Sequence, residues 1–144
     1  MGRTLLFFLV TLLIVPSAWA QSEDPIITDR PDFTESPVSV SPGTIQIELG
    51  ATAFDYDAGS LWNAGETLVR YGLFNKVEMR LQLPSAIGGD DLDSGLSDSG
   101  FGVKIELGSF AQRVEMALIA STTLPTGADD FTSDAVDPGL ILAA

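Results

Sequence analysis

The strongest constraint on this chain is a two-residue alternation of apolar and polar side chains. Throughout residues 77–83 every odd position is apolar and every even position is polar, a period that belongs to a β-strand and fits no helix. The period is less strict where Leu68, Ala117 and Ile119 fall on the polar phase. The alternating segments are residues 45–53, 66–73, 77–83, 101–107 and 114–124, and another begins at Leu140. We therefore predict an all-β chain whose antiparallel sheet has two unlike faces.

Two architectures share such alternation: a soluble antiparallel sheet packed on a core, and a membrane barrel with a wet lumen. Most segments are about 8 to 11 residues long, close to the roughly 9 to 11 that a tilted strand needs to cross a bilayer. Long connections (residues 55–65, 84–99 and 125–138) alternate with short ones (residues 74–76 and 109–112). That alternation is typical of an up-and-down outer-membrane barrel, which has short periplasmic turns and longer external loops.

The charged side chains within the predicted strands all fall on the polar phase. A barrel requires this, because an Arg or Lys turned to lipid at mid-depth costs about 2–4 kcal/mol. The solvated outer face of a soluble sandwich would show the same phase, so that alternative stays open. For the barrel we predict that the pore-lining residues are Glu48, Glu66, Arg70, Glu78, Arg80, Lys104 and Glu106.

The first twenty residues have the pattern of a secretory signal peptide. Arg3 precedes an apolar run at residues 5–15, and Ala18 and Ala20 are the small residues that a signal peptidase reads. Cleavage after Ala20 leaves a mature chain with 6 basic and 20 acidic residues, a formal charge of 6 − 20 = −14. Residues 21–43 are polar and proline-rich, so we predict an extended lead-in that serves as a tether or a lid. The predicted β-barrel portion is residues 44–144.

The composition excludes several functions. The chain has no His and no Cys, so it offers neither a Ser-His or Cys-His nucleophile pair nor a His or Cys metal site. A net charge of −13 with no basic stripe argues against nucleic-acid binding. The acidic cluster Asp90, Asp91, Asp93 and Asp98 lacks the spacing and the Glu of a calcium loop. We expect no catalytic residue, no metal and no cofactor.

Several motifs resemble one family of outer-membrane proteins, named after the meta-pathway of phenol degradation. They are residues 29–37 (DRPDFTESP), residues 43–50, residues 66–73 (ETLVRYGL) and residues 124–127 (LPTG), and the resemblance spans residues 28–142. It implies a transporter-like outer-membrane barrel and brings no catalytic residues with it. Members of that family are longer than this chain, which lacks their later strands and the aromatic C-terminus typical of outer-membrane barrels.

These observations lead to one main interpretation and two alternatives. We expect an open, partial outer-membrane β-barrel of a Gram-negative cell, in contact with outer-membrane lipid, that gives passage to small solutes, hydrophobic or aromatic ones included. Five full strands and a sixth beginning at Leu140 are fewer than the eight of the smallest bacterial barrels, so missing C-terminal strands or a second copy would close the sheet. The first alternative is a secreted or periplasmic β-sandwich that binds a partner through acidic loops. The second, an outer-membrane hydrolase, is disfavoured by the absence of His.

Overall fold

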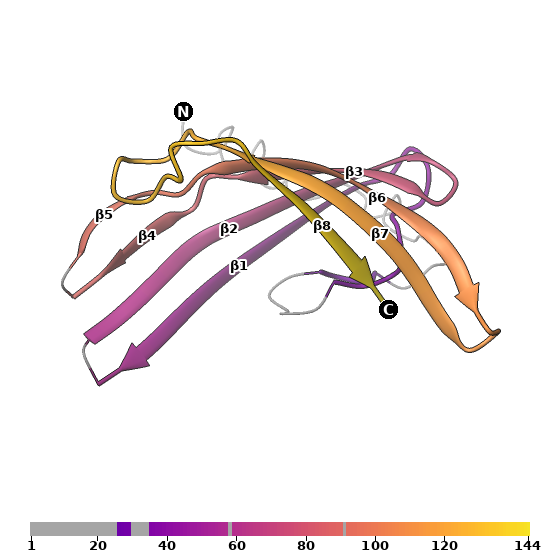
Figure 1. The fold of residues 1–144 in the computed structure, drawn as a ribbon, viewed down its shortest axis with the longest axis horizontal. Coiled ribbons are helices and arrows are strands. Elements are labelled where there is room, and N and C mark those ends of the chain that lie inside the picture. Colours follow the sequence, from indigo (N-terminus) through magenta and orange to yellow (C-terminus); the bar gives the residue numbers. More distant parts are fainter. Residues whose placement is uncertain (1–25, 30–34, 58, 91) are drawn as a thin grey trace, which may run out of the picture.

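The computed structural model describes residues 26–29, 35–57, 59–90 and 92–144. The predicted leader with Ala18 and Ala20, and the beginning of the lead-in, lie outside these ranges. In the described part every regular element is a strand, and all strands join one antiparallel sheet that does not close (Figure 1). The strands are β1 (Ile45–Tyr56), β2 (Gly59–Phe74), β3 (Val77–Leu83), β4 (Ala86–Gly89), β5 (Leu92–Leu96), β6 (Ser99–Phe110), β7 (Val114–Leu124) and β8 (Asp137–Ala143). The predicted all-β antiparallel meander is therefore confirmed.

Two of the expected long connections fold as strands. β2 pairs with β3 through residues 67–74 and with β4 through residues 61–64, so β3 and β4 follow one another along the same edge of β2. They are separated at Pro84, which has no N–H to donate to the ladder. β5 pairs with β4, and β6 pairs with β3, and both pairings are antiparallel. The segments 55–65 and 84–99 are thus mostly hairpin extensions, and only residues 125–136 form a long loop.

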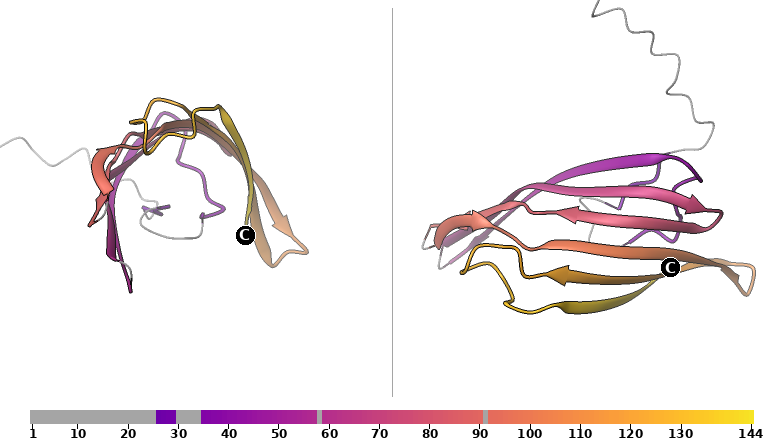
Figure 2. Two further views of the ribbon diagram at one scale, coloured as in Figure 1. Left: turned by 60° about the vertical axis from the view of Figure 1, so that its left-hand side comes forward. Right: turned by 90° about the horizontal axis from the view of Figure 1, so that it is seen from above.

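The sheet bends into an arch (Figure 2). The register of β1 with β2 shifts between Gly50 and Ala51. The extra residue is Gly65 of β2, whose φ is 73°. A second shift occurs in β6 beside Gly108, whose φ is 84°. Bulges of this kind increase twist and bend a strand, and glycine takes up the left-handed conformation without strain. The curvature therefore arises at positions where the sequence supplies glycine.

The two faces of the arch differ sharply. Leu49 is 71% exposed and Leu140 is 70% exposed on the convex face, where large apolar side chains prevail. In the described part of the chain no second sheet covers that face. The large exposed side chains of this face include Ile45, Ile47, Leu49, Tyr71, Leu81, Phe101, Ile105, Leu107, Leu140 and Leu142. The described residues contain no helix long and apolar enough to cross a membrane.

The described parts of the lead-in, residues 26–29 and 35–43, lie on the inside of the arch (Figure 2, left). The lead-in joins the sheet at Gly72, whose carbonyl accepts a hydrogen bond of 2.8 Å from Gly43 N and whose N–H donates one of 3.0 Å to Thr44 O. A Cβ at Gly72 would lie 2.1 Å from Ser41 O, so glycine permits the close crossing. These described parts of the lead-in are enclosed by the concave face, and the role of a tether or a lid stays a prediction.

Candidate functional site

Strand register brings charged side chains together on the concave face. In the pairing of β2 with β3, Arg70 lies directly opposite Arg80, and in the pairing of β3 with β6, Glu78 lies directly opposite Lys104. Like charges in directly opposite positions destabilise a sheet. The two arginines therefore require carboxylates between them.

Glu78 supplies the first of these carboxylates. Arg70 donates to both of its oxygens, with Nε 2.9 Å from Oε1 and Nη2 2.9 Å from Oε2. Arg80 Nη1 lies 3.3 Å from Oε1, and Lys104 Nζ lies 3.8 Å from it. The Glu78 and Lys104 side chains are completely buried, and Arg70 is 1% exposed. Such ions are tolerated in a buried position only when they are paired and fully hydrogen-bonded.

Asp29 of the lead-in supplies the second. Its Oδ2 lies 2.5 Å from Arg80 Nη1, 2.5 Å from Lys104 Nζ and 3.5 Å from Arg70 Nη1. Its other oxygen, Oδ1, accepts the Ser36 N–H at 2.9 Å. One carboxylate from outside the strands thus contacts cations from β2, β3 and β6.

Two more carboxylates complete an ion cluster. Glu48 Oε1 lies 3.0 Å from Arg70 Nη1, and Glu48 Oε2 accepts the Asp29 N–H at 2.8 Å. Glu35 Oε2 lies 2.7 Å from Arg80 Nη2. Among the described residues the ion cluster has three cations and four carboxylates: Arg70, Arg80, Lys104, Asp29, Glu35, Glu48 and Glu78.

The cations also hold the backbone of the lead-in. Arg70 donates to Ile27 O at 2.9 Å and to Val38 O at 2.8 Å, and Lys104 donates to Ser36 O at 2.8 Å. These bonds satisfy carbonyl groups of an extended segment that has almost no ladder partners of its own. The lead-in therefore depends on the strand cations as much as they depend on its carboxylates.

The remaining predicted residues also lie on the concave face. Glu106 Oε1 accepts both the N–H of Ser39 at 2.6 Å and its hydroxyl at 2.7 Å. Glu66 accepts the Thr52 hydroxyl at 2.8 Å. Five of the seven predicted residues thus join the ion cluster, Glu106 anchors the lead-in beside it, and Glu66 bonds to β1. Whether they line a pore stays a prediction.

The two carboxylates of the lead-in respond differently to burial. Burial alone would raise the pKa of Asp29, but the hydrogen bond and charge of Lys104, the charge of Arg70 and the hydrogen bond of Arg80 lower it to about 2. Burial raises the pKa of Glu35, and the nearby Asp29 adds to this while Arg80 opposes it. Asp29 is therefore the firmly ionised member of the pair.

Sequence reasoning missed Asp29 and Glu35 as site residues. Both belong to the DRPDFTESP segment that carried the family resemblance, and that motif was the available signal. Periodicity could not find them, because an extended segment has no face that fixes where it docks.

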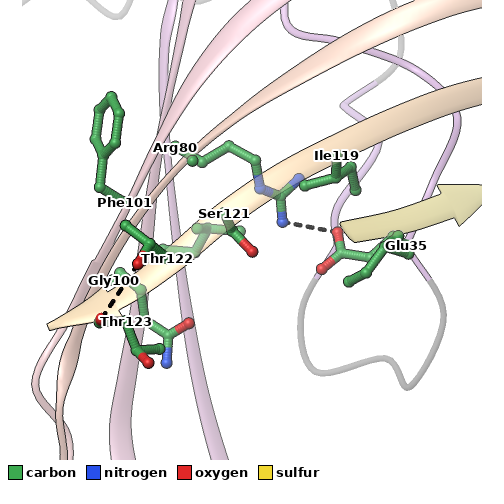
Figure 3. A pocket seen from close by; sticks show the side chains of 12 residues that line it. Glu35, Arg80, Gly100, Phe101, Ile119, Ser121, Thr122 and Thr123 are labelled. Atoms are coloured by element: carbon green, nitrogen blue, oxygen red, sulfur yellow. Dashed lines mark hydrogen bonds and ion pairs between the residues drawn. The ribbon is translucent and has the colours of Figure 1, made fainter. Parts of the chain in front are cut away.

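An open hollow of about 150 Å³ lies next to the ion cluster (Figure 3). The Arg80–Glu35 ion pair lies at one side of it, and β3, β6, β7 and β8 supply most of its wall. Leu68 and Ile119 contribute buried apolar surface, 3% and 2% exposed. This hollow is wide enough for a small molecule.

The acidic cluster near residue 98 has a structural role. Asp98 Oδ1 accepts the N–H groups of Thr126 and Gly127 at 3.0 and 2.8 Å, and its Oδ2 accepts that of Ser133 at 3.1 Å. These backbone hydrogen bonds, that of Gly127 foremost, lower the pKa of Asp98 to about 2. Asp91 lies outside the described residues. In the described ranges no group of three or more acidic side chains is arranged to hold a metal ion.

Fold and site together define a class of protein: a single curved antiparallel sheet with an apolar convex face and an ion-paired concave face that holds residues 26–29 and 35–43 of the same chain. The chain belongs to the family described as "Putative MetA-pathway of phenol degradation", whose model matches residues 28–144. The family resemblance found in the sequence is thereby confirmed. Comparison with curated proteins gave no match, and comparison with solved structures gave none either.

Proposed function

We propose that this chain forms part of an outer-membrane β-barrel that gives passage to small solutes, hydrophobic and aromatic ones included. The observation that carries the proposal is the difference in polarity between the two faces of the sheet. Apolar side chains cover the convex face, and the charged side chains of the strands gather on the concave face. A soluble sandwich would need a second sheet over the apolar face, and the described residues form only one sheet.

The convex face suits lipid better than water. Monomeric soluble proteins rarely expose a contiguous apolar patch larger than a few hundred square ångströms, whereas this face presents large apolar side chains along β1, β6 and β8. Backbone groups within the sheet are already paired, which is the condition for strands to cross hydrocarbon. The leader predicted at residues 1–20 would supply the export that an outer-membrane location requires.

The concave face suits a lumen in which the lead-in obstructs part of the path. Ten aspartates and no Lys or Arg occur in residues 55–65, 84–99 and 125–138, which gather at one end of the arch. The negative charge of these aspartates repels anions, so this end of the arch favours cations and uncharged solutes. We propose no catalytic step, because the carboxylates of the ion cluster are engaged by cations.

The open edges need partners for a complete barrel. In the described part of the chain β1 pairs only with β2, and β8 pairs only with β7. Each unpaired N–H or C=O costs several kcal/mol in hydrocarbon, so the proposal requires further strands. A longer form of the chain or a second copy can provide them.

Fractionation and solute flux test the proposal together. The protein should remain with outer membranes after a carbonate wash, and liposomes that contain it should swell in isosmotic solutions of small uncharged solutes. Release by carbonate would favour the periplasmic sandwich with acidic loops. Retention without any swelling would leave a membrane protein but remove the passage function.

A further inference from the structure

We propose that the hollow beside the Arg80–Glu35 ion pair is a binding site for a small uncharged solute with a ring-sized apolar body and one polar group. The inference rests on the proposed function, since it names the class of solute that the lumen would select. Four features of the hollow support the proposal: its floor, its apolar wall, its polar groups with free hydrogen-bonding capacity, and the charged groups beside it that are already paired with one another.

Two glycines form the floor. Gly100 lies between Gln82 and Thr123 in the register of the sheet, and Gly102 lies between Arg80 and Ser121. Because neither glycine has a side chain, this part of β6 adds nothing to the concave face. A Cβ at Gly100 would meet only ordinary contacts, the nearest being Gln82 Cβ at 3.4 Å, so the space is not needed for backbone packing at that position. Phe101 between them turns its ring to the other side of the strand (Figure 3).

The size and the apolar wall fit a single ring. A dry cavity of about 150 Å³ lined by aliphatic and aromatic side chains is known to hold benzene, and this hollow has a volume of about 150 Å³. Leu68, Ile119 and Ile141 supply aliphatic surface from three strands. Leu68 and Ile119 are already only 3% and 2% exposed, so the gain of about 25 cal/mol per Å² removed from water comes mainly from Ile141, which is 43% exposed, and from the apolar body of the solute itself.

Polar groups with free hydrogen-bonding capacity face the same space. The side chains of Gln82, Ser121 and Thr123 line the hollow, and among the described residues none of these three side chains has a hydrogen-bond partner within the protein. The Gln82 amide can both donate and accept, and so can each hydroxyl. A solute with one hydroxyl or carbonyl group can therefore be oriented by them.

The charges beside the hollow are already satisfied. Arg80 contacts Glu35 at 2.7 Å, Asp29 at 2.5 Å and Glu78 at 3.3 Å. An ion that entered would lose hydration without finding an unpaired counter-charge, which makes its transfer unfavourable. An uncharged solute pays no such desolvation cost.

Ligand-observed NMR on the protein purified in detergent provides the test. The four probes differ only in one ring substituent: benzyl alcohol, benzoate, benzylammonium and toluene. Benzyl alcohol should bind saturably above micelle partition, and benzoate and benzylammonium should bind at least about tenfold more weakly. Gly100→Val, which fills the floor, should weaken benzyl alcohol binding about tenfold or more. The matched control Ala120→Val adds methyl groups on the exposed opposite face of β7 and should leave binding unchanged.

A second variant keeps the test valid if Gly100→Val fails to fold. Gln82→Leu should weaken benzyl alcohol about two- to tenfold through the lost hydrogen bond, while toluene binding stays the same or tightens. Absence of saturable benzyl alcohol binding, tighter binding of either ion, or equal effects of Gly100→Val and Ala120→Val would overturn the site. Liposome swelling without saturable binding would contradict the binding site but support the passage function. Saturable binding without swelling would support the binding site but contradict the passage function.

Discussion

At the scale of single residues, one carboxylate joins two parts of the chain. Asp29 is 3% exposed and touches Arg70, Arg80 and Lys104, which come from three different strands. Directly opposed arginines would repel each other across β2 and β3, so the buried cations need a carboxylate that the strands alone do not fully supply. Through Asp29 the lead-in thereby becomes part of the charge balance of the sheet.

Asp29→Asn should release the lead-in from the sheet. Removing one partner of a buried ion pair typically costs about 3–5 kcal/mol, and here three cations lose the same partner. The amides of Ser39 and Val40, which donate to Glu106 and Glu78, should exchange with deuterium much faster than in the wild type. Unchanged exchange at both amides would show that Asp29 does not hold the segment.

The same variant should change the pH dependence of docking. The pKa of Asp29 is lowered from 3.8 to about 2 in the docked state, so its stabilisation is complete above the ordinary pKa and is lost as the pH falls through about 2. The difference in amide protection between wild type and Asp29→Asn should therefore shrink as the pH falls from about 4 to about 2. Asp29 contributes to the raised pKa of Glu35, so both proteins carry Glu35→Gln in this comparison. A difference that is constant over this range would contradict an ionised Asp29.

Arg80→Ala should make the channel more selective for cations. The substitution leaves Asp29, Glu35 and Glu78 with one cation fewer, while Leu81→Ala changes only the convex face. Reversal potentials in planar bilayers should shift for Arg80→Ala and stay near the wild-type value for Leu81→Ala. Equal, negligible shifts in a conducting channel would argue against a lumen position for Arg80.

At the scale of elements, the lead-in is held where it crosses β2. Ser41 O and Val40 O would lie 2.1 and 2.5 Å from a Cβ at Gly72, and both are backbone atoms that cannot rotate away. The crossing and the ion cluster are thus two separate anchors for the same segment. Loss of either one should loosen it.

Gly72→Ala should displace the lead-in and leave the sheet intact. The added methyl group clashes with the lead-in backbone, whereas Gly50→Ala, the control, meets its nearest atom at an ordinary 3.5 Å. Deuterium exchange at Ser39 and Val40 should rise in Gly72→Ala alone, with protection in β6 and β7 unchanged. If both variants behave like the wild type, the close crossing does not exist in solution.

The two-residue period predicted the bounds of two strands, one with strict alternation (residues 77–83) and one in which Ala117 and Ile119 interrupt it (residues 114–124). The bounds of β3 and β7 were expected at residues 77–83 and 114–124, as observed. The start of β2 was missed because the bulge at Gly65 shifts the phase of its first residues, and β4 and β5 were missed because they are short and rich in Gly and Ser. The period also put the seven predicted charges on one face. It could not indicate Asp29, whose position depends on a docking contact between distant segments.

At the scale of the whole molecule, the sheet has two free edges and one uncovered apolar face. Expressed and refolded alone in detergent, residues 21–144 should not give a compact, closed monomer, because β1 and β8 lack outer partners in the described structure. Light scattering and heat-modifiable gel migration measure this directly. A protease-resistant monomer with every strand paired would contradict the open-barrel account and would favour the sandwich.

The most direct test of the central claim uses the absence of cysteine from the chain. Single nitroxide labels at positions 77–83 in membranes can report accessibility to oxygen, which concentrates in lipid, and to a water-soluble nickel complex. We expect oxygen accessibility to follow a two-residue period, high at positions 77, 79, 81 and 83 and low at positions 78, 80 and 82. At these even positions the nickel complex should reach any label that contacts the aqueous lumen. Odd positions inaccessible to both reagents would indicate a packed protein core in place of lipid and would contradict the account.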